Sequence, residues 1–220
     1  MNSNYTIRKA SILDVAFLAD VIIGAEKSMS DNLGLALFFG LDETELKKLI
    51  VAMLEEEVDG CEFSISSFFL ACHDENPVGA LGGWLEGYYD DMPSSLLKSN
   101  LIGYVFPKEN IIQAQSKFEI IKDIQFVREK GAYQLEYSFV DSEHRGRRLT
   151  QQLMKAHLDY AQQLDPDVRK AQLQPFENNK VIIGVHEKTG FRIVKRYVSH
   201  HKDILDYMPY NAKVLMERPF

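Results

Sequence analysis

Residues 140–154 of this 220-residue chain read VDSEHRGRRLTQQLM. The segment that leads into them, residues 134–140, is rich in β-forming residues and predicts a strand. The segment that follows, residues 151–163, has apolar side chains at helical spacing and predicts an amphipathic helix. A polar loop with arginine and glycine joins the two. Such a strand–loop–helix unit presents backbone N–H groups at a helix N-terminus, which is a natural position for a phosphate.

Strands and helices alternate on both sides of this unit, so we predict an α/β fold. Apolar, β-rich runs predict strands at residues 5–9, 65–72, 77–88, 134–140, 170–174, 191–199 and 212–218. Helical spacing predicts helices at residues 13–26, 43–57, 151–163 and 179–188, and Asp42 is a candidate N-cap for the second of them. Residues 94–130 have a mostly helical pattern. We therefore expect a helical insertion at about residues 91–130, between the third and fourth strands.

Composition and charge limit the classes of protein to which this chain can belong. With 45% hydrophobic and 26% charged residues, the chain can bury one substantial core, and we expect a single domain over residues 1–220. The net charge of -7 argues against nucleic acid as a partner, because that interface depends on lysine and arginine. No apolar run has the length of a membrane helix and no targeting segment is recognisable, so we expect a cytoplasmic protein without a membrane partner. Cys61 and Cys72 are expected to be buried thiols in a reducing compartment.

Two segments together resemble a known family. Residues 140–154 resemble the acyl-CoA signature of the GNAT superfamily, in which a strand ends in an Arg/Gln-x-x-Gly-x-Gly/Ala loop and a helix follows. Residues 179–191, NKVIIGVHEKTGF, resemble the downstream Asn-x-x-Ala-x-x-Leu-Tyr-Glu-Lys-x-Gly-Phe pattern of the same superfamily. The resemblance implies a mixed, mostly antiparallel sheet of about six to seven strands flanked by helices. It also implies an N-acetyltransferase with acetyl-CoA as co-substrate and no metal.

The resemblance assigns the binding of CoA to particular positions. It implies that the loop and the helix start bind the pyrophosphate and that the backbone of the preceding strand binds the pantetheine arm. One more contact comes from the start of the second motif. The residues concerned are Phe139, Val140, Arg145, Gly146, Arg147, Arg148, Leu149, Thr150, Gln151 and Asn179. Alternatives from the residues alone are an exposed basic turn for the loop, core packing for the two strand residues, and a plain N-cap for Asn179.

The loop departs from the superfamily pattern at two positions. Arg148 stands where glycine is usual, and Thr150 stands in place of glycine or alanine. If the first position requires a positive φ, a non-glycine residue there costs about 1 kcal/mol in backbone strain. The guanidinium of Arg148 can instead pair with a phosphate.

Acyl transfer to an amine requires removal of a proton, because an alkyl amine is almost wholly protonated at pH 7. Glu136 resembles the base carboxylate of some family members and would act through water, while a solvent-facing strand residue is the alternative. His186 stands where the superfamily commonly has the Tyr that donates to the departing thiolate. A histidine there keeps a donor and changes the pH response, while a structural histidine in a cleft is the alternative.

Two classes of function remain open at this level. The first is an active enzyme that transfers an acetyl or other small acyl group from acyl-CoA to a primary amine by direct attack in a ternary complex. The second is a catalytically degenerate acyl-CoA-binding sensor or interaction module. The acceptor would be a small-molecule or peptide amine, near the acidic and aromatic residues 86–91 unless these form a solvated loop. The insertion would lie over the acceptor side, either restricting access or forming the contact of a homodimer.

Overall fold

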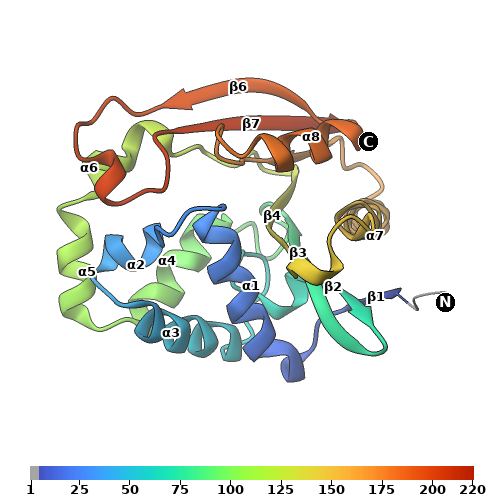
Figure 1. Cartoon of the computed structure of the whole chain (residues 1–220), viewed down its shortest axis with the longest axis horizontal. Coiled ribbons are helices and arrows are strands. Elements are labelled where there is room, and N and C mark those ends of the chain that lie inside the picture. The colour runs from blue at the N-terminus through green and yellow to red at the C-terminus, as the bar shows by residue number, and fades with distance from the viewer. Residues whose placement is uncertain (1–4) are drawn as a thin grey trace.

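The computed structural model describes residues 5–220 as a seven-stranded sheet flanked by helices (Figure 1). The strand order is β1-β2-β3-β4-β5-β7-β6, and β4 with β5 is the one parallel pair. This confirms the mixed, mostly antiparallel sheet. The strands are β1 Tyr5–Lys9, β2 Phe68–His73, β3 Asn76–Leu85, β4 Tyr133–Val140, β5 Lys170–Leu173, β6 Arg192–Val198 and β7 Ala212–Pro219.

Helices cover both faces of the sheet. The α-helices are α1 Val15–Lys27, α2 Gly34–Phe39, α3 Glu43–Glu55, α4 Ser94–Val105, α5 Lys108–Gln115, α6 Phe118–Ile121, α7 Leu149–Leu164 and α8 Lys180–Lys188. Short 3₁₀ helices are η1 Ile12–Asp14, η2 Ile65–Ser67, η3 Lys122–Ile124, η4 Ser142–His144 and η5 Ile204–Asp206. The predicted helical insertion is α4 to α6 with η3, between β3 and β4. In the described residues, no helix is long and apolar enough to span a bilayer.

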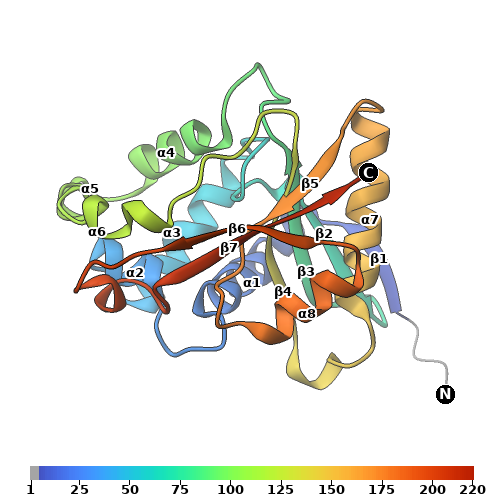
Figure 2. The same ribbon diagram turned by 90° about the horizontal axis from the view of Figure 1, so that it is seen from above.

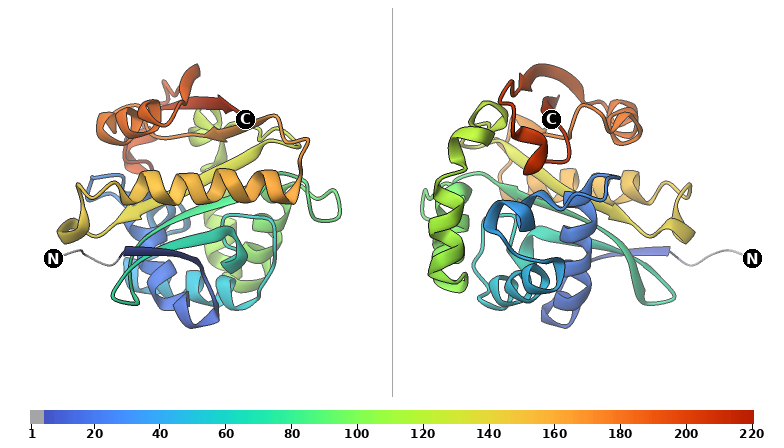
Figure 3. Two further views of the ribbon diagram at one scale, coloured as in Figure 1. Left: turned by 90° about the vertical axis from the view of Figure 1, so that its right-hand side faces the viewer. Right: turned by 60° about the vertical axis from the view of Figure 1, so that its left-hand side comes forward.

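Each face of the sheet has its own apolar core. The long helix α7 packs against β1 to β4 on one face and lies in front of the sheet in the left panel of Figure 3. Helix α1 packs against β3 and β4 on the other face, with α2, α3 and the insertion helices around it. Figure 2 shows α4 and α5 on the opposite side of the molecule from α7. The insertion therefore extends the second core and does not cover the helix that follows the predicted phosphate loop.

Several predicted boundaries shift for local reasons. Asp42 is the N-cap of α3, where its carboxylate accepts from the Glu45 N–H at 2.8 Å, as predicted. The strand expected at residues 65–72 begins at Phe68, because η2 precedes it. The strand expected to reach residue 88 ends at Leu85, since Gly87 takes a φ of 73° in a turn. Helix α2 was not predicted, because its short, uniformly apolar sequence has no helical period to detect.

The two central strands pair for only part of their length. β4 pairs with β5 from Tyr133 to Leu135, and the pairing then stops. On its other side, β4 continues along β3 to Val140 through a bulge, where Tyr137 takes a φ of 55°. From Glu136 onward, the edge of β4 that faced β5 has no strand partner in the described chain. The gap between these strands is the feature around which the candidate site is built.

The pH dependence of folding should report a buried histidine of this core. His157 on α7 lies between the Leu81 carbonyl at 2.7 Å and the Tyr133 hydroxyl at 2.9 Å, and burial lowers its pKa to about 4. The unfolded chain therefore binds a proton that the folded chain excludes between about pH 6.5 and 4. We expect His157 to lower the unfolding free energy by up to about 1.4 kcal/mol per unit as pH falls through this window.

Urea denaturation at pH 7, 6 and 5 measures this contribution. His157→Gln, which cannot take up the proton, should show a shallower loss of stability than wild type on acidification. His200→Gln is the matched control, because His200 is exposed. Equal pH slopes for wild type and His157→Gln would contradict the assignment.

Candidate active site

A cavity of about 680 Å³ opens where β4 and β5 separate. The end of α1, α2 and the insertion form part of its wall. The rest of the wall is formed by β4, the β5–α8 connection, α8 and β7. The polar and charged side chains that line it are Glu26, Ser28, Ser95, Lys98, Ser99, Gln115, Gln125, Arg128, Glu136, Tyr137, Ser138, Gln174, Asn179, His186 and Lys213. The two predicted catalytic residues, Glu136 and His186, thus face one space from different elements.

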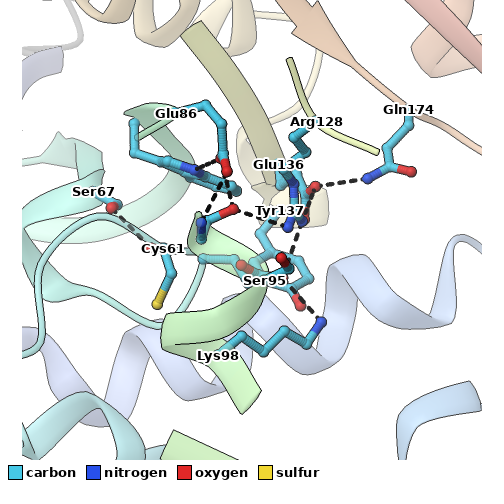
Figure 4. A network of polar contacts seen from close by, with 12 residues as sticks. Cys61, Ser67, Glu86, Ser95, Lys98, Arg128, Glu136, Tyr137 and Gln174 are labelled. Carbon is cyan, nitrogen blue, oxygen red and sulfur yellow. Dashed lines mark hydrogen bonds and ion pairs between the residues drawn. The ribbon is translucent and has the colours of Figure 1, made fainter. Parts of the chain in front are cut away.

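In the described structure, only one of the two carboxylate oxygens of Glu136 accepts hydrogen bonds. Its Oε1 accepts from the Arg128 guanidinium at 2.6 Å and from the Gln174 side-chain amide at 2.9 Å (Figure 4). Its Oε2 accepts from no residue of the 5–220 range. The side chain is 16% exposed, so Glu136 is not the solvent-facing strand residue that was the alternative to a base. The arrangement fixes the carboxylate and leaves one oxygen free to accept a proton.

Arg128 joins this carboxylate to a second, fully buried one. Its guanidinium also donates to Glu62 at 3.0 Å, and Lys98 donates to the same Glu62 oxygen at 2.9 Å. Burial alone would raise the pKa of Glu62, but the charges of Arg128 and Lys98 hold it at about 2. Glu62 Oε2 has no hydrogen-bond partner in the described structure. The orientation of Glu136 therefore depends on a buried ion network.

His186 lies in the wall of the cavity at 4% exposure, against the ring of Phe191. Its Nδ1 is buried without a hydrogen-bond partner among the described residues. Burial lowers its pKa to about 4, so the imidazole is neutral at pH 7. Asn179 lies about two turns earlier, at the start of α8. Its Oδ1 accepts from the Ile182 N–H at 3.2 Å, and its side chain also lines the cavity.

Three further cavity residues were not identified from the sequence. The Tyr137 hydroxyl donates to Glu26 Oε1 at 3.2 Å, and burial raises the pKa of that carboxyl. Lys213 on β7 lies over the ring of Phe176 at 4.9 Å, and burial lowers its pKa. One signal was available, because Glu26 continues the four-residue spacing of Leu18 and Ile22 on the buried face of α1. No such sequence signal was available for Lys213, since a lone lysine in a strand is usually solvent-facing.

The residues after the third strand do not form part of the site. Glu86 was considered as an acceptor contact, but it is 4% exposed and accepts from the Trp84 indole, the Ser94 N–H and the Ser94 hydroxyl. No residue of 86–91 is among those that line the cavity. The carboxylate at this position therefore fixes the start of α4.

The predicted phosphate loop lies at the far end of β4. Gly146 and Arg148 take φ values of 77° and 61°, so the chain turns sharply into α7. Over the described residues, the N–H groups from Gly146 to Gln151 have no hydrogen-bond acceptor. The Arg145 side chain donates to the Val140 carbonyl at 3.0 Å, and Arg147 lies over the Tyr5 ring at 5.5 Å. Such converging, unpaired donors fit an anionic group.

A sequence model of the acetyltransferase (GNAT) family matches residues 43–191. The chain belongs to this family. Acyl transfer from acyl-CoA is the family's activity. No curated protein matches the chain.

Solved structures share the GNAT fold at low identity. An N-acetyltransferase from Staphylococcus aureus Mu50 is 14% identical with a TM-score of 0.68, over 96% of this chain and 99% of that one. The paia N-acetyltransferase from Thermoplasma acidophilum in complex with coenzyme A is 12% identical with a TM-score of 0.54, over 99% of each chain. An agmatine N-acetyltransferase in its apo form is 11% identical with a TM-score of 0.56, over 98% of this chain and 99% of that one.

The residues predicted to bind CoA lie in two places in the structure. Phe139 and Val140 follow the strand separation, where β4 has no partner on the β5 side. The Phe139 ring packs against Gly24 of α1, and the Val140 carbonyl accepts from Arg145. Residues 145–151 form the loop and lie outside the cavity lining, whereas Asn179 and His186 are within it. In residues 5–220, no group of three or more His, Cys, Asp or Glu side chains is placed to hold a metal ion.

Removing Arg128 should leave two carboxylates without their shared counter-charge. We expect Arg128→Met to lower the unfolding free energy by about 3–5 kcal/mol, as for other broken buried ion pairs. Lys98→Met is the matched control, because the 31% exposed Lys98 forms an ion pair with Glu62 but none with Glu136, so a smaller loss is expected. Urea denaturation at pH 7 measures both, and equal losses would contradict the central role of Arg128.

The left-handed conformation of Arg148 should favour glycine there. We expect Arg148→Gly to be more stable than Arg148→Ala by about 1 kcal/mol, since both remove the guanidinium and only glycine is free of the strain. The same pair at Lys180, the first residue of α8, should show the opposite order. Thermal unfolding of the four variants checks this, and an alanine variant as stable as the glycine variant at position 148 would contradict it.

Proposed function

We propose that the chain is an N-acyltransferase that transfers an acetyl or other small acyl group from acyl-CoA to a primary amine by direct attack in a ternary complex. One observation supports this most directly. Glu136 from β4 and His186 from α8 line the same cavity at the strand separation. A group that can take the proton of an amine and a group that can donate to a departing sulfur thus face one reaction space.

The chain offers a binding surface for CoA along the whole separation. The loop from Arg145 to Gln151 supplies backbone donors for the pyrophosphate, and its three arginines add positive charge. Beyond Leu135, the edge of β4 that has no strand partner supplies backbone groups for an extended amide-containing arm, while the Val140 carbonyl already accepts from the Arg145 side chain. Bound acyl-CoA would supply the thioester whose carbonyl carbon is attacked and whose sulfur leaves.

Glu136 acts as the base in this proposal. Arg128 and Gln174 hold its Oε1, which leaves Oε2 to accept the proton of the attacking amine directly or through one water. As the new N–C bond forms and the C–S bond breaks, this proton passes to the carboxylate and then to solvent. Because two donors fix the carboxyl group, it needs little reorganisation during the step.

His186 acts as a neutral donor to the sulfur. With a pKa lowered to about 4 by burial, the imidazole is not a protonated acid at pH 7, so it stabilises the leaving thiolate by a hydrogen bond and the sulfur takes its proton from solvent. Apolar residues of the insertion, among them Ile102, Ile111 and Phe118, line the opposite wall and limit water in the cavity. The buried free thiols Cys61 and Cys72 support a reducing, cytoplasmic location.

Calorimetric titration with acetyl-CoA, combined with thiol release in the presence of amines, tests the proposal. Saturable binding and amine-dependent release of CoA are expected. Glu136→Gln should lower kcat by about 100-fold or more while the affinity for acetyl-CoA stays within about twofold, since the base acts only in the chemical step. Glu55→Gln, an exposed glutamate on α3, is the matched control.

The outcomes separate the two functions left open by the sequence. Binding without turnover of any amine would indicate the degenerate acyl-CoA-binding module. Turnover that is unchanged in Glu136→Gln would remove Glu136 from the mechanism, and His186→Phe with a wild-type rate would remove His186. No binding of acyl-CoA would contradict the proposed function as a whole.

A further inference from the structure

We propose that Lys213 and Glu26 form a subsite for an acceptor that has a carboxylate in addition to its amine, namely a free amino acid with an apolar side chain. The inference rests on the proposed function, because it names the acceptor class of the same cavity. It begins from the charges in the cavity wall that the catalytic arrangement does not use.

Lys213 is the cation of the cavity wall that has no counter-charge in contact. Lys98 and Arg128 both form ion pairs with Glu62, and Arg128 also pairs with Glu136. Within residues 5–220, Lys213 forms no ion pair and no hydrogen bond, and its one close neighbour of note is the Phe176 ring at 4.9 Å. A half-buried ammonium group that lines a cavity without a counter-charge in contact is unfavourable, so the cavity favours a ligand that brings an anion to this position.

Glu26 faces the same space from α1. Its contact with the Tyr137 hydroxyl is its one hydrogen bond in the described structure, and it forms no ion pair. Lys213 and Glu26 attract one another electrostatically, yet they are too far apart for a salt bridge. Two opposite charges separated by a gap in an apolar cavity suit a zwitterion, which satisfies both at once.

The remaining wall favours an apolar body on this ligand. The aromatic and aliphatic side chains that line the cavity are Leu35, Phe38, Phe39, Leu81, Ile102, Ile111, Phe118, Ile121, Phe126, Leu135, Leu173, Phe176, Ile182 and Met208. The volume of about 680 Å³ is in the range of small-ligand sites and is shared with the acyl end of the donor. An amino acid such as phenylalanine or leucine matches this size and polarity.

Other acceptor classes fit these groups less well. A polyamine would bring a second positive charge towards Lys213 and Arg128, and like charges at short range repel. A simple amine would leave the Lys213 ammonium unmatched. A nucleotide or sugar would place many polar groups against the apolar wall, where each needs a hydrogen bond.

A matched set of acceptors tests the assignment with the full-length enzyme. Phenylalanine, phenylalanine amide and phenethylamine share the ring and the amine, and only the first has a carboxylate. Steady-state kinetics by thiol release at saturating acetyl-CoA should give a KM for phenylalanine at least tenfold below that for the other two. Putrescine serves as the dicationic comparison and should be the poorest acceptor.

Variants assign the carboxylate preference to its residue. Lys213→Met, which is close in size and uncharged, should raise the KM for phenylalanine at least tenfold and bring the phenylalanine-to-phenethylamine ratio near one. Lys213→Arg should keep a clear preference for the carboxylate. Lys195→Met is the matched control, because Lys195 also lies over an aromatic ring, Tyr197 at 4.7 Å, but is exposed on β6, so the wild-type ratio should persist.

Direct binding separates failure of this subsite from failure of the proposed function. Calorimetric titration of phenylalanine into the CoA-saturated protein needs no turnover, and binding that Lys213→Met weakens at least tenfold would support the subsite even in an inactive protein. Equal KM values for phenylalanine and phenethylamine in wild type would overturn the inference. A preference that persists unchanged in Lys213→Met, or the absence of phenylalanine binding to the CoA complex, would do the same.

Discussion

The parallel pairing of β4 with β5 stops after Leu135, although β4 continues for five more residues along β3. The bulge at Tyr137 makes this possible, and it needs space on the neighbouring strand. Glycines of β3 provide that space, since a Cβ at Gly79 would lie 2.9 Å from the Phe139 carbonyl oxygen and one at Gly82 would lie 3.1 Å from that of Glu136. The bulge directs Glu136 and Tyr137 into the cavity and frees the β4 edge beyond them. The rest of the site is arranged around this separation.

Placing charge in an apolar cavity is unfavourable unless each charge is matched. In this chain the segment before β4 supplies one matching charge, because Arg128 follows the insertion and lies between the carboxylates of Glu62 and Glu136. The insertion supplies the apolar wall and, from α4, the Lys98 cation, while Arg128 comes from the connection between the insertion and β4. This explains how a segment outside the two recognisable motifs is tied to the orientation of the predicted base.

The sequence predicted the sheet, most helices and the loop before α7 because these depend on local patterns within about 15 residues, such as the alternation in residues 134–140 and the polar residues 145–148. It did not predict what Glu86 or Lys213 contacts, because their partners come from distant segments that meet only in the folded chain. The sequence allowed the statement that a positive φ at Arg148 would cost backbone strain. It could not predict that the φ of Arg148 is 61°. The position of Glu26 was predictable in part. Helical spacing is consistent with the buried face of α1, but no local pattern indicates that this face borders a cavity.

Several polar groups of the described chain have no partner within residues 5–220. Buried donors and acceptors of folded proteins are nearly always paired, so groups that remain free mark positions where something else completes them. These groups are the N–H groups of residues 146–151 in the loop, the edge of β4 beyond Leu135, and His186 Nδ1 and the Lys213 ammonium in the cavity wall. The first two suit an anionic, amide-containing cofactor, the third suits a departing sulfur, and the last suits a carboxylate. The ternary complex that we propose would use these groups, with the donor held by the loop and the β4 edge and the acceptor held in the cavity.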